Sequence, residues 1–310
     1  MKIFLDTDIG TDSDDAVCLA YLLLHTECEL MGVTTVGFQA DLRAKIAEKV
    51  CSHFGHPEIP VVAGAESPVL PNRYWWGHHV NQDVILDGSP ERGSGRPADA
   101  LSLMESVVRD NPDEIALLTV GPTTNAALFA TSYPETARTL KAIYTMGGRL
   151  GYDPDEPRTE CNIMLDPAAA CALLSRNLPN HTVFPVNITG PLHLTGEEAE
   201  TLFEGEIFDP LRQCCGAWNE QKKSDGTGLH DPFTAACLLE PNLCTCQRGR
   251  MGIKLANYDL SRGFELEKDR ITGWTYFDAD PDGPHRVAID SDKKRFHKHL
   301  NKIFSEARNK

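Results

Sequence analysis

Short apolar runs alternate with longer amphipathic segments along most of the chain. The run Lys2–Asp6 precedes a segment of helical periodicity from Asp14 to Leu24, and the run Leu30–Val36 precedes a second such segment from about Leu42 to Phe54. The alternation then continues through Ile59–Ala63, Ala98–Arg109, Ile115–Thr119, Thr123–Thr131, Leu140–Met146, a helix from Asp166 to about Ser175, and Thr182–Val186. Strands that alternate with helices predict an α/β fold, with a mainly parallel central sheet covered by helices on both faces in a Rossmann-like arrangement.

The length of the chain is compatible with one large domain. At 310 residues it stands at the upper edge of what one hydrophobic core supports, and no repeat, low-complexity tract or linker divides it. We therefore expect a single domain over residues 1–310. In open α/β sheets ligands bind beyond the carboxyl ends of the strands, so we expect the functional side chains directly after strands.

Composition argues against several classes of protein. Acidic residues number 45 and basic residues 30, and the net charge of −15 argues against a nucleic-acid partner, because a phosphate backbone requires a basic surface. No apolar stretch approaches the roughly 20 residues of a membrane-spanning helix, and the N-terminal apolar run is too short for a secretory signal. We therefore expect no membrane partner and a cytoplasmic location. The ten cysteines are scattered without zinc-ligand spacing, and we expect them to be reduced and structural.

Five aspartates occur within ten residues at the exit of the first strand: Asp6, Asp8, Asp12, Asp14 and Asp15. The dipole of a helix N-terminus favours one or two nearby acids. Five converging carboxylates repel one another unless a cation neutralises them. Because the ligand atoms are all oxygens, the sequence predicts a site for a hard cation, either Ca²⁺ or Mg²⁺.

Two other aspartate motifs fit this segment less well. An EF-hand needs a glycine at loop position six and an acidic residue at position twelve, but counting from Asp6 these positions hold Thr11 and Val17. A haloacid-dehalogenase-type phosphotransferase needs Thr or Val two residues after its Asp-x-Asp turn, where this chain has Gly10. A Mg²⁺-dependent Asp-x-Asp phosphohydrolase, with the turn as nucleophile, stays open as an alternative function.

Several segments of the chain follow one another in the order of a known family. After the turn from Asp6 to Asp15 come Thr34-Thr35-Val36, Val120–Asn125, Met146-Gly147-Gly148, Glu160–Ile163 with Asp166-Pro167, His230-Asp231-Pro232 and Arg286–Asp290. Together these segments resemble the inosine–uridine-preferring nucleoside hydrolase family over almost the whole chain. The resemblance implies an N-ribosyl hydrolase that cleaves the N-glycosidic bond of ribonucleosides to free base and ribose, in purine and pyrimidine salvage.

The resemblance also implies a role for each matching residue. Asp8 and Asp15 would be calcium ligands, and Asp231 and the backbone carbonyl of Val120 would complete the protein ligands. Asp8 would also act as general base on a calcium-bound water, because attack on an oxocarbenium-like sugar needs an activated nucleophile. His230 would be the acid for the departing base. The residues implied at the ribose are Asp14, Met146, Glu160, Asn162 and Asp231.

Two departures from the family pattern leave roles open. The spacing between Asp8 and the Asp14-Asp15 pair is two residues longer than in the family's commonest form, so Asp12 is an alternative to Asp14 at the ribose. Gln39 stands where many members have Asn or Asp, in the loop after the second strand. This substitution bears on the sugar contact that the loop makes in the family.

Two further segments are candidates for walls of the site. The aromatic run Tyr74-Trp75-Trp76 precedes a Gly-rich stretch, and its rings could stack on a nucleobase or serve only for packing. Trp218 and the loop from Lys222 to Leu229 could form a second mobile wall that excludes water.

The resemblance implies a small-molecule nucleoside as partner, with the chain in a homodimer or homotetramer. It leaves open the choice between purine and pyrimidine bases and between ribose and deoxyribose. A non-catalytic protein that binds calcium or a nucleoside on the same fold is a second alternative to the hydrolase.

Overall fold

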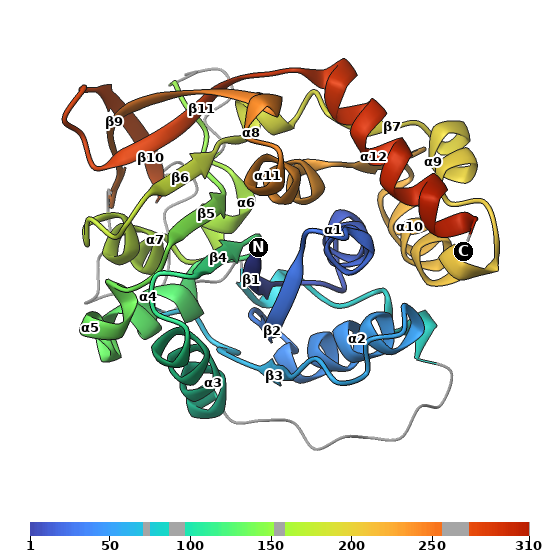
Figure 1. Ribbon diagram of the computed structural model, residues 1–310, viewed down its shortest axis with the longest axis horizontal. Helices are drawn as coiled ribbons and strands as arrows, with labels where there is room; N and C mark the ends of the chain where they lie inside the picture. Colours follow the sequence, from blue (N-terminus) through green and yellow to red (C-terminus); the bar gives the residue numbers. More distant parts are fainter. Residues whose placement is uncertain (71–74, 87–96, 152–158, 256–272, 310) are drawn as a thin grey trace.

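A computed structural model describes residues 1–70, 75–86, 97–151, 159–255 and 273–309 of the chain. Its centre is a nine-stranded sheet, which crosses the molecule from β10 to β3 in the order β10-β9-β11-β6-β5-β4-β1-β2-β3 (Figure 1). The strands are β1 (Lys2–Thr7), β2 (Glu29–Thr35), β3 (Val61–Ala63), β4 (Ile115–Thr119), β5 (Ala142–Met146), β6 (His181–Phe184), β9 (Cys244–Lys254), β10 (Trp274–Ala279) and β11 (His285–Ser291).

Most neighbouring strands of this sheet run parallel. All pairs from β3 through β6 to β11 are parallel, and only β9 pairs antiparallel, with β10 and with β11. The part β3-β2-β1-β4-β5-β6 has the strand order of a doubly wound Rossmann fold. In that order the chain first builds outward from β1 to β3 and then returns to place β4 on the other side of β1. The carboxyl ends of β1 and β4 therefore flank the point at which ligands bind in such folds.

Helices cover the sheet on both faces (Figure 1). On one face lie α1 (Asp14–Leu24), α2 (Ala40–His53) and α11 (His230–Leu239), and α12 (Lys293–Arg308) packs outside α1. On the other face lie α3 (Pro97–Asp110), α4 (Thr124–Ser132), α5 (Pro134–Ala137) and α7 (Pro167–Leu174). The remaining described elements include α6 (Cys161–Leu165), α8 (Val186–Thr189), α9 (Gly196–Leu202), α10 (Asp209–Lys222) and the small sheet of β7 (His193–Leu194) and β8 (Thr227–Gly228).

Strand β1 separates two apolar clusters. Ile3 and Leu5 point into the cluster shared with α1 and α11, whereas Phe4 points into the cluster shared with α4, where it joins Phe129. Because both faces of the strand are buried, its sequence reads as a continuous apolar run, as is typical of central parallel strands.

The expected fold class is confirmed, and the first helix has the bounds that the periodicity predicts. Strands β9 and β10 were not predicted. Strand β9 alternates exposed polar residues with buried ones and contains Gly249 and Gly252, so it lacks the apolar run that marked the central strands. Among the described residues, no helix is both long enough and apolar enough to cross a membrane.

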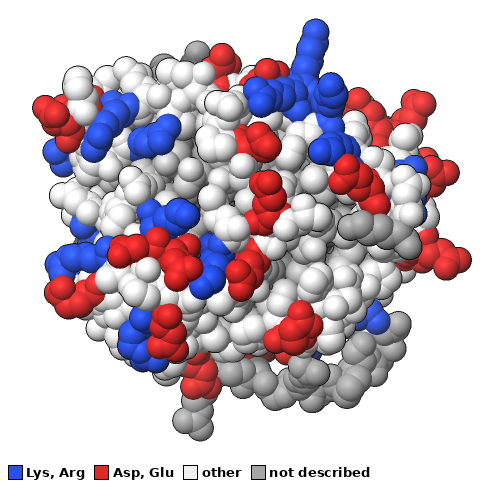
Figure 2. All heavy atoms as spheres, viewed as in Figure 1, with Lys and Arg blue, Asp and Glu red and all other residues white. Residues whose placement is uncertain are grey.

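The charged side chains on the surface differ in arrangement from the carboxylates of the first turn. On the face shown in Figure 2, acidic and basic side chains are interspersed over the surface. The carboxylates of the first turn, in contrast, are withdrawn from solvent, because Asp8, Asp14 and Asp15 are all buried. The dense negative charge therefore lies inside the protein, where an unneutralised carboxylate is costly.

Asn125, at the start of α4, connects two strands and the segment after a third beneath the site. Its Nδ2 donates to Oδ1 of Asp6 (2.8 Å) and to the carbonyl of Thr35 (3.0 Å), and its Oδ1 accepts from the backbone amide of Ala65 (2.8 Å). Thr34 also donates to Oδ1 of Asp6 (2.7 Å). Burial raises the pKa of Asp6 to about 7, although these hydrogen bonds oppose the shift. The network joins β1, β2 and the segment after β3.

We expect Asn125→Ala to lower the free energy of unfolding by about 2–4 kcal/mol, because it removes three buried hydrogen bonds and leaves the amide of Ala65 without its acceptor. Urea unfolding followed by circular dichroism measures this change. Thr201→Ala, which removes an exposed hydroxyl that bonds within its own helix, is the control and should change stability by less than about 0.5 kcal/mol. An equal, small effect of both substitutions would contradict the assigned importance of the network.

Candidate functional site

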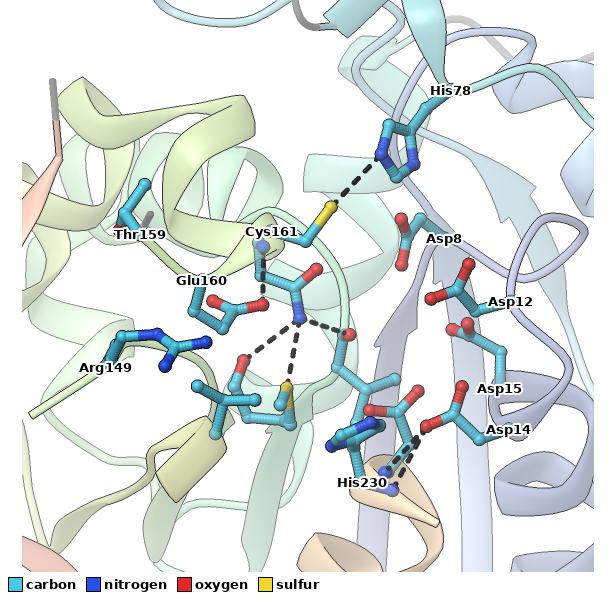
Figure 3. Close-up of a pocket in the computed structure, with 15 residues that line it drawn as sticks. Asp8, Asp12, Asp14, Asp15, His78, Arg149, Thr159, Glu160, Cys161 and His230 are labelled. Carbon is cyan, nitrogen blue, oxygen red and sulfur yellow. Dashed lines mark hydrogen bonds between the residues drawn. The ribbon is translucent and has the colours of Figure 1, made fainter. Parts of the chain in front are cut away.

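A pocket of about 270 Å³ opens beyond the carboxyl ends of β1, β4 and β5. It lies at the point where the doubly wound order predicts a ligand. The structure brings every residue of the predicted site to its wall: Asp8, Asp14, Asp15, Val120, Met146, Glu160, Asn162, His230 and Asp231 (Figure 3). These residues come from five separate parts of the chain, and the roles given to them are predictions.

The first turn places its aspartates by ending a strand and starting a helix. Asp8 directly follows β1, and Asp14 and Asp15 form the first turn of α1. Thr7 donates its hydroxyl to Oδ1 of Asp15, and its own Oγ1 accepts from the amide of Ile9 (3.1 Å). One threonine thus fixes both the turn and the carboxylate that follows it.

Asp8 also depends on a close approach by the loop after β4. A Cβ atom on Gly121 would lie 2.8 Å from both the amide nitrogen and Oδ1 of Asp8. Real Cβ contacts are longer than this, so only glycine leaves room for the Asp8 carboxylate in its observed position.

Three carboxylates form a compact group. Asp14, Asp15 and Asp231 each offer an oxygen, and the three oxygens lie within 4.8 Å of one another. Burial first, and then repulsion from neighbouring carboxylates, raises the pKa of Asp15 and of Asp231 well above the ordinary value. Among the described residues, no Lys or Arg forms an ion pair with this group. Buried oxygen donors with uncompensated charge suit a hard cation.

Asp8 lies in the same pocket but outside that compact group. Burial raises its pKa to about 6, a shift that the Arg43 guanidinium opposes and Asp14 reinforces. Asp12, which lies only partly buried in the pocket wall, has its pKa raised to about 8 by burial and by Asp14 and Asp8. Asp8 and Asp12 therefore differ in pKa, and Asp8, which has the lower value, ionises more readily.

Arg43, on α2, is fully buried directly behind the turn. Its guanidinium donates to the backbone carbonyls of Asp8, Ile9 (3.1 Å) and His78 (2.9 Å), and its Nε donates to that of Phe38 (2.9 Å). Because its partners are carbonyls, the positive charge is left to act on the nearby carboxylates. The sequence prediction missed Arg43, although a cation on the otherwise apolar face of a helix is a detectable signal.

Asp14 links the first helix to α11. Its Oδ2 accepts from the backbone amides of His230 (3.1 Å) and Asp231 (3.4 Å). The residue before α11, Leu229, offers no side-chain cap, so Asp14 provides the acceptor from a distant part of the chain. The segment His230-Asp231-Pro232 is thus both the start of a helix and a wall of the pocket.

His230 is held in one orientation. Its Nδ1 bonds with Oγ1 of Thr189 (2.8 Å), a residue of α8, and the side chain is half-buried in the pocket wall. A Cβ atom on Gly228 would lie 2.8 Å and 3.0 Å from Cδ2 and Nε2 of the imidazole, so a larger residue there would displace the ring. Among the described residues, Nε2 has no hydrogen-bond partner, which leaves it for a ligand.

The opposite wall is organised by Asn162. Its Nδ2 donates to the carbonyls of Val120 (2.8 Å) and Met146 (3.2 Å), which anchors the side chain to the ends of β4 and β5 (Figure 3). With the amide nitrogen engaged in this way, Oδ1 is the atom that remains to accept a hydrogen bond from a hydroxyl.

Glu160 caps α6 and supports the neighbouring loop. Its carboxylate accepts from the amides of Asn162 (2.7 Å), Ile163 (3.1 Å) and Gly148 (2.9 Å). Burial raises the pKa of Glu160 to about 7, against the opposing effect of these three amides. The side chain is therefore fixed in position by backbone groups on two segments.

Asp12, the alternative to Asp14 at the ribose, also lines the pocket, together with residues to which the sequence gave no role in the site: His78, Arg149, Thr159, Cys161 and Val186. His78 Nε2 contacts Sγ of Cys161 (3.1 Å), and burial together with Arg43 lowers the pKa of His78 to about 4, so this imidazole is neutral near pH 7. Cys161 was expected to be structural only. Its place between Glu160 and Asn162 was the available signal.

The two predicted loop walls fall largely outside the pocket. Trp75 is buried and donates its Nε1 to the carbonyl of Glu66 (2.8 Å), which makes it a packing residue, and Trp76 is exposed. Tyr74 lies outside the described residues. Gln39 accepts from the amide of Val80 (2.9 Å) and does not line the pocket. From the segment Lys222–Leu229, Thr227 and Gly228 form strand β8.

Comparison with known proteins identifies a family of similar sequences. The family model for inosine-uridine preferring nucleoside hydrolase matches residues 3–298. An uncharacterised protein of Schizosaccharomyces pombe is 31% identical over 281 residues, which are 86% of this chain and 88% of that protein. The pyrimidine-specific ribonucleoside hydrolase RihA of Shewanella baltica is 30% identical over 288 residues, 88% of each chain.

Solved structures share the fold. The purine-preferring ribonucleoside hydrolase from Gardnerella vaginalis superposes with a TM-score of 0.81 at 23% identity and covers 99% of both chains. A plant nucleoside hydrolase, PpNRh1, superposes with a TM-score of 0.78 at 22% identity over 98% of both chains. At this level of identity the likeness shows that the architecture is that of nucleoside hydrolases.

Proposed function

This chain belongs to the inosine-uridine preferring nucleoside hydrolase family, and we propose that it hydrolyses ribonucleosides with Asp8 as general base and Ca²⁺ as its metal. Membership makes it an N-ribosyl hydrolase, an enzyme that releases a free base and ribose. The observation that carries the finer proposal is the convergence of the first-turn aspartates, Asn162 and His230 on one pocket. The family match gives no support to the alternative of an Asp-x-Asp phosphohydrolase.

The carboxylate group fits a calcium ion. Its oxygens are buried, converge within 4.8 Å and have no basic partner among the described residues. Ca²⁺ takes six to eight oxygen ligands in flexible geometry, which suits carboxylates and carbonyls together. We assign its ligands to Asp8, Asp15, Asp231 and the carbonyl of Val120, and Asp14 lies close enough to contribute. When bound, the ion supplies a Lewis acid that orients a water and lowers its pKa.

Asp8 is suited to accept the proton of the attacking water. It is buried in the pocket, and a pKa of about 6 leaves it ionised near neutral pH while keeping it basic enough to take a proton. Its neighbour Asp12, with a pKa raised to about 8, is mostly protonated at that pH. Arg43 favours the ionised form of Asp8 from behind the turn.

The remaining residues hold the ribose. Asn162 offers Oδ1 to a hydroxyl, and Asp14 and Asp231 are close to the proposed ion, where the 2′ and 3′ hydroxyls can be bound as well. Glu160 presents a fixed carboxyl group, and Met146 packs against the sugar face. The same negative groups stabilise the positive charge that develops on the sugar as the C–N bond breaks.

His230 serves the departing base. Thr189 fixes its Nδ1, which directs Nε2 toward the pocket, where it can donate a proton or a hydrogen bond to the base. The backbone amide of the same residue also donates to the Asp14 carboxylate, so His230 has a structural contact as well.

The proposal also covers the domain organisation, oligomeric state, location and first substrates of the enzyme. We propose that residues 1–310 act as one domain and that the enzyme is a homodimer or homotetramer, as the family resemblance implies. All ten cysteines are unpaired, which is the usual state in a reducing compartment and supports a cytoplasmic location. Pyrimidine ribonucleosides are the first substrates to test, because RihA of Shewanella baltica is pyrimidine-specific.

Calcium binding tests the metal assignment. Calorimetry on chelator-treated protein should show one Ca²⁺ per chain, and saturation at about 100 times Kd should stabilise the fold by about 2.7 kcal/mol. Asp15→Asn should abolish this binding, whereas Asp282→Asn, at an exposed carboxylate, should leave it unchanged. Binding that survives Asp15→Asn would contradict the proposed ligand set.

Replacement of Asp8 tests the general base. Asp8→Asn keeps the shape and one oxygen donor but cannot accept the proton, so kcat on a ribonucleoside should fall by about 10²–10⁴-fold at saturating calcium. Asp12→Asn is the matched comparison from the same turn. If Asp12→Asn causes the greater loss and Asp8→Asn retains near-normal turnover, the base has been assigned to the wrong aspartate.

Removal of His230 tests the acid. His230→Ala should lower kcat on natural ribonucleosides by about 10²-fold, because an unprotonated base is a poor leaving group. It should affect p-nitrophenyl riboside far less, because that substrate leaves as a stabilised phenolate. A purely structural role at the start of α11 would reduce both activities in parallel, so equal losses on the two substrates would refute the assignment.

A further inference from the structure

Arg149 lines the pocket on the wall opposite the first-turn aspartates (Figure 3). It directly follows Gly148, whose amide is fixed by the Glu160 carboxylate (2.9 Å). Thr275 holds the backbone of Arg149 on both sides, since its Oγ1 accepts from the Arg149 amide (2.9 Å) and donates to the Arg149 carbonyl. The backbone of the arginine is therefore anchored, and its side chain is directed along the pocket wall.

The guanidinium has no acidic partner among the described residues. Within the described part of the chain its Nε is buried and makes no hydrogen bond, and no ion pair joins it to Glu160, which lines the same side of the pocket (Figure 3). The influences that lower the pKa of Glu160 come instead from backbone amides. A buried donor without an acceptor is costly, and a guanidinium presents several donors in a planar fork that matches phosphate oxygens.

The proposed orientation of the ribose decides which part of a substrate reaches Arg149. The 2′ and 3′ hydroxyls are assigned to the carboxylates around Asp14 and Asp231, and C1′ faces Asp8. On a ribose ring the C5′ substituent projects from the side of C4′, away from C2′ and C1′. It therefore points toward the opposite wall, which carries Glu160 and Arg149.

We propose that Arg149 binds a phosphate group on the 5′ carbon of the substrate, so that this enzyme accepts nucleoside 5′-monophosphates as well as nucleosides. This inference rests on the proposed function and specifies its substrate class. The reaction is the same hydrolysis: the C1′–N bond breaks, the hydroxyl of water adds to C1′, and a proton goes to the base. The products are the free base and ribose 5-phosphate.

The position of the phosphate group on the sugar decides whether Arg149 can bind it. A phosphate on the 3′ oxygen would replace the hydroxyl that is proposed to donate to Asp14 and Asp231, whereas a 5′ phosphate leaves that hydroxyl in place. A pair of isomeric nucleotides with equal charge therefore distinguishes recognition by Arg149 from general attraction of anions.

The first experiment compares kcat/KM for uridine, uridine 5′-monophosphate and uridine 3′-monophosphate, measured as release of uracil by the calcium-loaded enzyme. The 5′-monophosphate should be at least as good a substrate as uridine and at least about 10-fold better than the 3′ isomer.

Arg149→Ala should lower the ratio of kcat/KM for the 5′-monophosphate to kcat/KM for uridine by about 10–10²-fold, the scale of a hydrogen bond to a charged group. Arg149→Lys should recover part of it. Arg109→Ala, which removes an exposed arginine on α3, is the control for net charge and should leave the ratio unchanged.

A second readout is independent of turnover. Calorimetry on the chelator-treated enzyme should show ribose 5-phosphate binding at least about 10-fold more tightly than ribose, and Arg149→Ala should remove the difference. If uridine is hydrolysed but the 5′-monophosphate is neither hydrolysed nor bound, the inference is overturned and the proposed function stands. If no ribonucleoside or nucleotide is hydrolysed while ribose 5-phosphate still binds through Arg149, the proposed function fails and the phosphate site stands.

Discussion

Mutual repulsion among buried carboxylates is the constraint that organises this protein. Asp14, Asp15 and Asp231 have their oxygens within 4.8 Å of one another and are almost fully removed from water. Such a group is tolerated when its oxygens accept hydrogen bonds, as Asp14 does from two amides and Asp15 from Thr7, and when a cation completes the balance. The surrounding residues fix the positions of these carboxylates. Arg43 contributes a buried positive charge whose hydrogen-bond partners, within the described part of the chain, are all backbone carbonyls, so its charge acts on the turn without occupying the carboxylates.

The sheet order explains how such distant residues meet. Because β4 lies on one side of β1 and β2 on the other, the loops that leave β1 and β4 diverge and open a crevice between them. Asp8 follows β1 and Val120 follows β4, so the crevice has an acidic turn on one side and a backbone carbonyl on the other. The end of β5 extends this second side with Met146 and Gly148, and Asn162 fastens the two strand ends together. The architecture thus separates a wall that carries negative charge from a wall that carries Asn162, Glu160 and Arg149.

The sequence predicted those features that have a local signature. Asp14–Leu24 was predicted as a helix from its periodicity, and the central strands were predicted because burial on both faces makes them continuously apolar. Strand β9 was missed because its exposed positions are polar and its glycines interrupt the pattern. In the site, the clustered aspartates are adjacent in sequence and therefore visible. Arg43 is visible in the sequence as a cation on an otherwise apolar helix face, but its place in the site was missed because its partners are backbone carbonyls of three different loops. The bond between Thr189 and His230 was equally hidden, since 41 residues separate them.

The contact of Asp14 with α11 has a consequence for the order of folding. It joins residues 216 and 217 positions apart, so it forms only after a very long loop of chain has closed. Contacts of such sequence separation are slow to form, because the entropy of loop closure is lost before the contact rewards it. Until α11 docks, Asp231 is remote and the aspartates of the first turn remain hydrated, so they impose little electrostatic strain on the growing sheet. The electrostatic cost of the pocket therefore arises only when this contact between α1 and α11 forms.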